Sequence, residues 1–391
     1  MLFQIKTKPE DFIVEEILPN WFPLWEWDFL YVFFEKENLT TMDVIDYLTK
    51  NLHLQRDELG IAWLKDKAWI TRQWISISKR SLDKIWWEDV FVKTLWEKVR
   101  ILEKSRNETW LKVASNDWNH FKIRLRARKK ISDEIKNQIE NNVQKIRERW
   151  FPNCFGMQRF GKWKKNFYEA KDRLKTLSEE LEKKWKLVES DLPYHLRFLL
   201  QAYPSMYFNE YVLNRWEKGL FLLQWDILVD KFNSNWVKTA VYDSQNVYLF
   251  DYQKLKKEKT DLNLFEPDIE WGLVEAYSDK RFSTGPMLWW NLLLPWMWTK
   301  ARVRDDQLLL LAEFDEWIQQ VCKIYNLRWI RRVLFIRVPD LKFEWESNDI
   351  NLEFSLPTGS YATTLVSFIL QWIDHLTLKD NSLLIPKISE K

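Results

Sequence analysis

The chain has 391 residues, 46% hydrophobic and 30% charged, and can bury a sizeable core in one large or two ordinary domains. Its formal net charge is only +3, so any nucleic-acid surface must come from local clusters of basic residues. Two cysteines exclude a disulfide framework, and four histidines without ligand spacing make a metal site unexpected. The first residues lack a signal-peptide core and no apolar run reaches the ~18 residues of a membrane span, so we expect a cytoplasmic protein.

The composition is abnormal in one respect, with 26 tryptophans and 7 glycines. Average usage of about 7% predicts roughly 27 glycines in a chain of this length. Tryptophans also stand in turn-like contexts, as at Trp118 and Trp163, where glycine would adopt a positive φ at little cost. We hypothesise that the gene uses UGA for glycine and that these codons were translated as tryptophan. The alternative is a truly tryptophan-rich protein; UGG codons at Trp63, Trp118 and Trp163 would end the hypothesis.

The first elements predicted are two strands and a helix. Residues 4–17 and 28–36 have the composition and alternation of strands. The run Thr40-Thr41-Met42-Asp43 then predicts a helix start, and the apolar positions after it share one helical face. This helix is expected to be structural.

A charged loop follows in residues 60–74. Asp66 lies between Lys65 and Lys67, just before the alternating run that begins at Trp74, which predicts a loop leading into a strand. Two flanking ammonium groups favour the ionised carboxylate. Such an aspartate suits nucleophilic attack or proton removal on a polyanionic substrate. The alternative is a surface turn with alternating charges.

Residues 117–130 predict a strand with one apolar and one basic face. The basic face could contact phosphates, or it could be a solvated surface; its cations are Lys122, Arg124, Arg126 and Arg128. Ser132 then caps a predicted helix.

The second half of the chain is predicted to be helical from about 162 to 330 and to return to strands over 328–366. Residues 165–187 form a charged helix, and residues 192–213 form an apolar-faced one kinked at Pro204. Residues 252–262 are expected to be an exposed loop, and residues 283–286 a turn.

Five collinear segments resemble the TruD family of tRNA pseudouridine synthases. The family's catalytic motif runs Ala-Gly-Leu-Lys-Asp-Lys/Arg, a short gap, then Thr-x-Gln-Trp, and it is matched here except that Trp63 replaces the glycine. The matching residues are Ala62, Leu64, Lys65, Asp66, Lys67, Thr71, Gln73 and Trp74. The opening Lys-x-x-Pro-Glu-Asp-Phe-x-Val-x-Glu is also matched, by Lys6, Pro9, Glu10, Asp11, Phe12, Val14 and Glu16.

Three further segments extend the resemblance. Asn119 and Phe121 match a Gly-Asn-x-Phe segment whose glycine is Trp118 here. Residues 152–161, Pro-Asn-Cys-Phe-Gly-Met-Gln-Arg-Phe-Gly, match every fixed position of the family's most recognisable stretch, in which Arg159 is available for a phosphate or a buried carboxylate. Residues 354–363 match Phe-x-Leu-Pro-x-Gly-Ser-Phe/Tyr-Ala-Thr.

The resemblance implies an α+β fold, in which a pseudouridine-synthase catalytic domain with a mixed or antiparallel sheet is interrupted by a largely helical insertion domain. The catalytic domain would comprise residues 1–160 and 331–391, and the insertion residues 161–330. By the same resemblance Asp66 is the catalytic residue, Lys6 and Glu16 lie near the site, and four residues bind the target nucleotide: Phe12, Asn119, Phe121 and Tyr361. Lys6 is our candidate for holding Asp66 charged, with Lys65 and Lys67 as alternatives.

The implied activity is isomerisation of a flipped-out uridine of tRNA, by inheritance uridine 13, to pseudouridine. The expected partner is tRNA; we expect no cofactor, no metal and no membrane association, and a monomer. An alternative is an inactive RNA-binding or RNA-chaperone protein on the same scaffold, which real tryptophans at positions 63 and 118 would favour. A nucleoside glycosidase is disfavoured because no second acidic motif accompanies Asp66.

Overall fold

The computed structural model describes most of the first half of the chain and separate segments of the second half. The described residues are 2–18, 28–62, 64–65, 69–85, 88–112, 116–148, 150–184, 192–218, 226–229, 239–242, 246–250, 268–271, 282–287, 301, 304–306, 308, 312, 316–325, 327 and 330–371. The predicted loop at 252–262 lies outside them, as do Asp66 and Lys67.

The chain divides into two compact units, each made of two stretches. The first unit contains residues 1–147 and 338–359, and the second contains residues 148–337 and 360–391. The functional division into a catalytic domain and an insertion at 161–330 remains a prediction.

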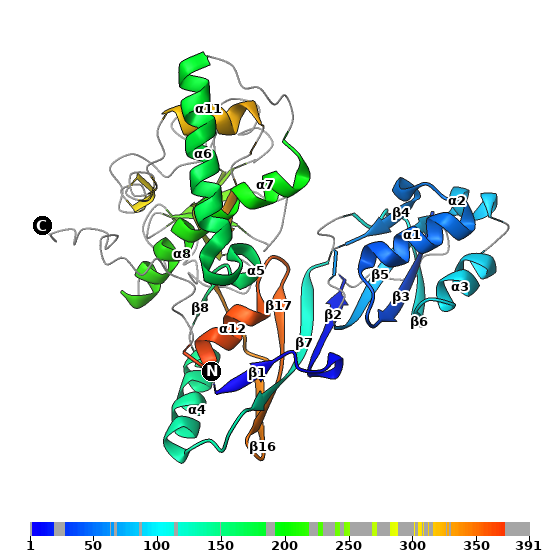
Figure 1. The fold of residues 1–391 in the computed structure, drawn as a ribbon, viewed down its shortest axis with the longest axis horizontal. Helices are drawn as coiled ribbons and strands as arrows, with labels where there is room; N and C mark the ends of the chain where they lie inside the picture. The colour runs from blue at the N-terminus through cyan, green and yellow to red at the C-terminus, as the bar shows by residue number, and fades with distance from the viewer. Residues whose placement is uncertain are drawn as a thin grey trace, which may run out of the picture. The chain divides into compact units, whose positions relative to one another are not determined.

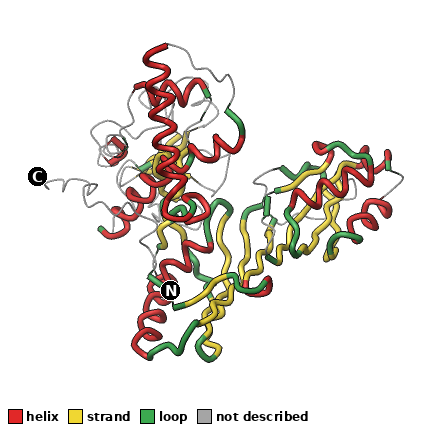
Figure 2. The backbone as a smooth tube through the Cα atoms, viewed as in Figure 1, coloured by secondary structure: helices red, strands yellow, loops and turns green. Residues whose placement is uncertain are grey.

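The first unit is built on a mixed sheet whose described strands follow the order β16-β17-β7-β2-β5-β3-β6, with β1 beside β7 and β4 beside β5 (Figures 1 and 2). Only the β2–β5 pair is parallel among these described strands. The strands are β1 (Phe3–Ile5), β2 (Phe12–Ile17), β3 (Phe29–Lys36), β4 (Leu59–Ile61), β5 (Ile70–Ser78), β6 (Arg100–Asn107), β7 (Trp118–Ala127), β16 (Lys342–Glu346) and β17 (Asp349–Pro357).

Helices α1 (Thr41–Leu52) and α3 (Glu88–Trp96) pack their apolar faces against β3 and β5, and this contact forms a hydrophobic core of the unit (Figure 1). The predicted start of α1 is confirmed, because the Thr40 side chain accepts a hydrogen bond from the Asp43 amide and the Asp43 carboxylate accepts one from the Thr40 amide. The other helices of the unit are α2 (Lys79–Lys84) and α4 (Asp133–Glu148).

The single strand predicted over residues 4–17 is wrong. A turn of 3₁₀ helix, Pro9–Asp11, separates β1 from β2, because Pro9 opens the turn and Asp11 accepts a hydrogen bond from the Lys8 amide. Lys6, in the same connection, has a φ of +65°. A lysine in this left-handed region is uncommon and is held there by the surrounding structure.

The second unit combines a sheet of order β12-β11-β10-β9-β13-β14, a small β15–β8 pair and several helices. Its described strands are β8 (Phe151–Pro152), β9 (Ile227–Val229), β10 (Thr239–Tyr242), β11 (Asn246–Phe250), β12 (Asp268–Trp271), β13 (Phe282–Met287), β14 (Ile330–Val333) and β15 (Phe335–Ile336). Its described helices are α5 (Met157–Phe160), α6 (Lys165–Lys184), α7 (Tyr194–Leu200), α8 (Ala202–Glu217), α11 (Glu316–Ile324) and α12 (Ala362–Ile369).

Several predictions for this unit need correction. Strands β9 to β13 interrupt the stretch predicted to be helical; most are only three to five residues long, too short for a clear alternation. The predicted turn at 283–286 is strand β13, where a β-carbon on Gly285 would lie 2.6 Å from Leu334, so glycine serves close packing there. The kinked helix at Pro204 is two helices, and the proline lies in the first turn of α8.

None of the helices in the described part of the chain is long and apolar enough to cross a membrane. Among the same residues, no group of three or more histidine, cysteine, aspartate or glutamate side chains could hold a metal ion.

Candidate active site

The loop that carries Asp66 is anchored at the residue before it. Asp66 itself lies outside the described residues, but the Lys65 amide donates to Thr41 Oγ1 at 2.8 Å, and the Thr41 amide donates to the Lys65 carbonyl at 3.3 Å. Ala62, at the start of the loop, is fully buried against Tyr31 and Leu111. The first helical residue of α1 therefore fixes the backbone immediately before position 66.

The Lys65 side chain joins two strands of the sheet. Its ammonium group donates to Oδ1 of Asn119 at 2.7 Å and lies 3.5 Å from Oε1 of Glu16. The register of β2 and β7 places Glu16 directly opposite Asn119, so one lysine reaches both. Three segments far apart in the sequence meet at this point.

Glu16 is buried and serves as the acceptor of this cluster. Its Oε2 accepts a hydrogen bond from the Trp74 amide at 3.1 Å. Burial raises the pKa of Glu16 above its ordinary value, and the charge of Lys65 opposes this shift. The neighbouring Gln73 accepts a hydrogen bond from the Thr41 hydroxyl at 3.0 Å. Gln73 and Trp74 thus hold the end of the motif to the same network as Lys65.

The side-chain oxygen of Asn119 accepts two hydrogen bonds. Oδ1 accepts hydrogen bonds from Lys65 and from Nδ2 of Asn116, the second at 3.3 Å. These two donors fix which end of the amide is oxygen, and the amide nitrogen of Asn119 has no acceptor among the described residues. The sequence did not indicate Asn116 or Thr41 as part of the site; the contacts that recruit them depend on tertiary structure.

An aromatic cluster lies on the same strands. The Phe12 ring meets Phe121 edge-on at 6.2 Å between centroids, and Phe121 stacks on Phe354 at 5.5 Å. Phe12 and Phe121 are both buried. The Lys6 ammonium lies 4.1 Å from the Phe12 ring centroid and 4.7 Å from that of Trp69. The structure thus groups Lys6, Phe12 and Phe121, and it leaves the proposed contact of Lys6 with Asp66 a prediction.

Tyr361 belongs to the second unit, at the N-cap of α12. Its ring lies 5.7 Å from that of Phe155, in the stretch at 152–161 that the sequence singled out. The guanidinium of Arg332 lies 5.8 Å from the Tyr361 ring centroid. Tyr361 therefore has aromatic and cationic neighbours within its own unit.

The basic face predicted on β7 is largely neutralised. Arg126 forms a two-pronged ion pair with buried Asp11, with both hydrogen bonds at 2.7 Å. Burial alone would raise the pKa of Asp11, but the hydrogen bonds from Arg126 and the Lys8 amide lower it overall. Arg124 pairs with both Asp349 and Glu346, and Lys122 pairs with Glu353.

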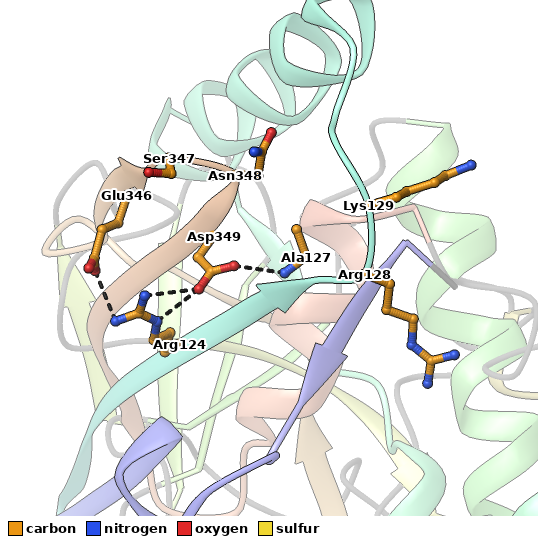
Figure 3. Close-up of a pocket in the computed structure, with 8 residues that line it drawn as sticks. All are labelled: Arg124, Ala127, Arg128, Lys129, Glu346, Ser347, Asn348 and Asp349. Atoms are coloured by element: carbon orange, nitrogen blue, oxygen red, sulfur yellow. Dashed lines mark hydrogen bonds and ion pairs between the residues drawn. The ribbon is translucent and has the colours of Figure 1, made fainter.

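A pocket of about 310 Å³ lies at the end of this strand. Figure 3 shows Arg124 turned toward Asp349 and Glu346, with Arg128 and Lys129 pointing away from that pair. Asp349 and Glu346 thus compensate the charge of Arg124 in this pocket. Most of the basic side chains of β7 form ion pairs within the first unit.

A family model described as tRNA pseudouridine synthase D (TruD) matches residues 2–174. A tRNA pseudouridine synthase D of Thermus thermophilus is 28% identical over 380 residues, which are 95% of this chain and 90% of the relative. That of Sulfurimonas denitrificans is 27% identical over 383 residues, 94% and 95% of the two chains. A solved structure from Methanosarcina mazei, described as a putative tRNA pseudouridine synthase D, shares the fold with a TM-score of 0.58 at 20% identity over 94% and 93% of the chains.

The mixed sheet and the motif residues gathered around Lys65 agree with these comparisons, in which the relatives are named as pseudouridine synthases. The chain is similar to the TruD family model over residues 2–174 and to the two relatives named above over more than nine tenths of its length.

Proposed function

We propose that this protein isomerises a uridine of tRNA, uridine 13, to pseudouridine, with Asp66 as the catalytic residue. The observation that carries the proposal is the hydrogen bond from Lys65 to Asn119. It ties the residue immediately before Asp66 to the amide proposed to bind the uracil, at 2.7 Å. The names of the relatives supply the substrate class.

The target base must leave its stack before it can react. Extruding it costs a few kcal/mol, and stacking on an aromatic ring returns ~1–3 kcal/mol per base. Phe12, Phe121 and Tyr361 are the rings proposed to receive it. Because Phe12 and Phe121 are buried among other rings, we expect them to offer an edge or a shifted face to the base. The Asn119 amide nitrogen would donate to a uracil carbonyl.

The ionised Asp66 then attacks C1′ of the ribose or removes a proton from C2′. Either route breaks the C1′–N1 bond, after which the uracil turns in the pocket. When the C1′–C5 bond forms, Asp66 leaves C1′ in the first route or returns the proton to C2′ in the second. The proton on C5 leaves to solvent, and N1 gains a proton. No net oxidation or hydrolysis occurs. Lys6 is the candidate for keeping the position-66 carboxylate ionised, with Lys65 and Lys67 as alternatives.

Release of tritium from tRNA labelled at C5 of uridine tests the proposal. Asp66→Asn should abolish release and leave tRNA binding within a few fold, whereas Asp57→Asn, an exposed aspartate of the same unit, should keep the wild-type rate. Release at the wild-type rate from Asp66→Asn would refute the catalytic assignment. Mapping pseudouridine in the product tests position 13 separately.

A further inference from the structure

The buried or partly buried arginines of the second unit include two, Arg215 and Arg331, that form ion pairs and two others that form none among the described residues. Arg215 pairs with Asp226 at 2.6 Å, and Arg331 pairs with Asp305 at 2.8 Å. Arg159 and Arg332 have no carboxylate within ion-pair distance among the described residues. Since buried charges are normally paired, this second pair needs another explanation.

Arg159 and Arg332 share one aromatic ring. The guanidinium of Arg332 lies 4.1 Å from the Phe155 centroid, and that of Arg159 lies 5.2 Å from it. Arg332 donates to the carbonyl and side-chain oxygens of Asn153, and Arg159 donates to Gln201. All of these acceptors are neutral, so the two positive charges are not compensated by the groups they contact.

The surroundings disfavour this concentration of positive charge. Burial lowers the pKa of Arg332 to about 10, and the like charge of Arg159 contributes to the shift. Arg332 still carries a charge at neutral pH. Nε of Arg159 is buried and has no hydrogen-bond partner among the described residues. A donor without an acceptor, beside a second cation, is suited to an anion.

The start of α12 adds further donors beside the two arginines. Tyr361 occupies the N-cap without a side-chain hydrogen bond to the helix. The side-chain oxygens of Ser360, Thr363 and Thr364 are buried and have no partner among the described residues. A β-carbon on Gly156 would lie 2.9 Å from Thr364 Oγ1, so the backbone that leads into α5 and Arg159 lies against this helix end.

We propose that Arg159 and Arg332 bind a phosphate of the RNA backbone adjacent to the nucleotide that Tyr361 contacts. This inference rests on the proposed function for the role of Tyr361. Guanidinium groups donate in pairs to phosphate oxygens, and the hydroxyls at the start of α12 can donate as well. The phosphate supplies the negative charge that the pair lacks among the described residues.

Binding of a tRNA transcript at several salt concentrations tests the proposal. Arg159→Gln and Arg332→Gln should each weaken binding about ten-fold, and each should reduce the slope of log affinity against log salt by about 0.7, the value for one lost contact to single-stranded RNA. Arg337→Gln is the matched control, because Arg337 is exposed and also lies over a ring, that of Trp150, and its loss removes the same charge. It should leave both quantities unchanged.

A second measurement guards against variants that fail to fold. In tRNA with one neutral methylphosphonate on either side of the target uridine, the wild type should lose affinity at one of the two positions. Arg332→Lys, which keeps a charge but not the paired donors, should lose less at that position than the wild type. Equal losses in both proteins would overturn the inference, as would folded glutamine variants that bind with wild-type affinity and salt slope. A wild type that binds tRNA through these arginines without tritium release would contradict only the proposed function.

Discussion

The ammonium group of Lys65 lies 2.7 Å from Oδ1 of Asn119, which is 54 positions away in the sequence. The same ammonium lies 3.5 Å from Glu16, whose side chain is completely buried. The lysine therefore orients the amide and compensates the buried carboxylate. It also precedes the proposed catalytic aspartate, so a change at position 65 should affect both stability and reaction.

Lys65→Met should impair folding and catalysis together. Removing one partner of a buried pair destabilises a protein by about 3–5 kcal/mol, which urea unfolding would measure. Loss of orientation at Asn119 should lower kcat/KM about 10²-fold, since small displacements in an active site have effects of that size. Lys50→Met, an exposed lysine of α1, should change neither value.

The two effects of Lys65 can be separated with Glu16→Gln. In the double variant no buried carboxylate lacks a partner, and the glutamine oxygen can still accept from the Trp74 amide. Stability should recover toward the wild-type value, and activity should stay low because Asn119 has lost its donor. Recovery of both would show that Lys65 has only a structural role.

Arg126→Met should destabilise the first unit without changing how tRNA binding depends on salt. The guanidinium of Arg126 is already used by Asp11, which would be left buried without its partner. The urea midpoint should therefore fall. A decrease in the salt slope like that expected for Arg332→Gln would instead mean that Arg126 contacts RNA phosphate.

The contrast between Arg126 and Arg332 shows what the sequence could and could not predict. Alternation correctly predicted the strand that carries Asn119 and Phe121, and the cap at Thr40 predicted α1. Alternation also predicted a basic face, but it cannot show that Asp11 lies opposite Arg126. That pairing depends on the 3₁₀ turn at 9–11.

The candidate site was predicted mainly by matching motifs. Lys6, Phe12, Asn119 and Phe121 lie in the first unit and Tyr361 lies in the second, and their shared role in binding the nucleotide stays a prediction. The contact between Lys65 and Asn119 could not be derived from sequence, because it depends on the β2–β7 register. Asp66 and its distance from these residues stay a prediction.

Acid unfolding should report on Glu58, in the turn between α1 and β4. The hydrogen bond from Lys84 and that from the Gln55 amide lower the pKa of Glu58 to about 2. Because this pKa is lower in the folded protein, the ionised Glu58 stabilises the fold at pH values above 4.5, the ordinary pKa of a glutamate. This stabilisation is lost as the pH falls toward about 2. The urea midpoint of the wild type should therefore exceed that of Glu58→Gln near neutrality and converge with it in acid. The control Glu108→Gln, at an exposed position, should have the urea midpoint of the wild type near neutrality and in acid.

Trp163 is the position at which the structure bears most directly on the excess of tryptophan. Its φ is +56° and its side chain is 93% exposed, so the residue has a backbone conformation that favours glycine and gains little from burial. Trp163→Gly should stabilise the protein by about 1–2 kcal/mol, the cost of the left-handed conformation for other residues. Urea unfolding of the two proteins measures the difference. Peptide mass spectrometry of protein purified from its natural source then tests the codon hypothesis, since glycine at 163 supports reading UGA as glycine and tryptophan there rejects it.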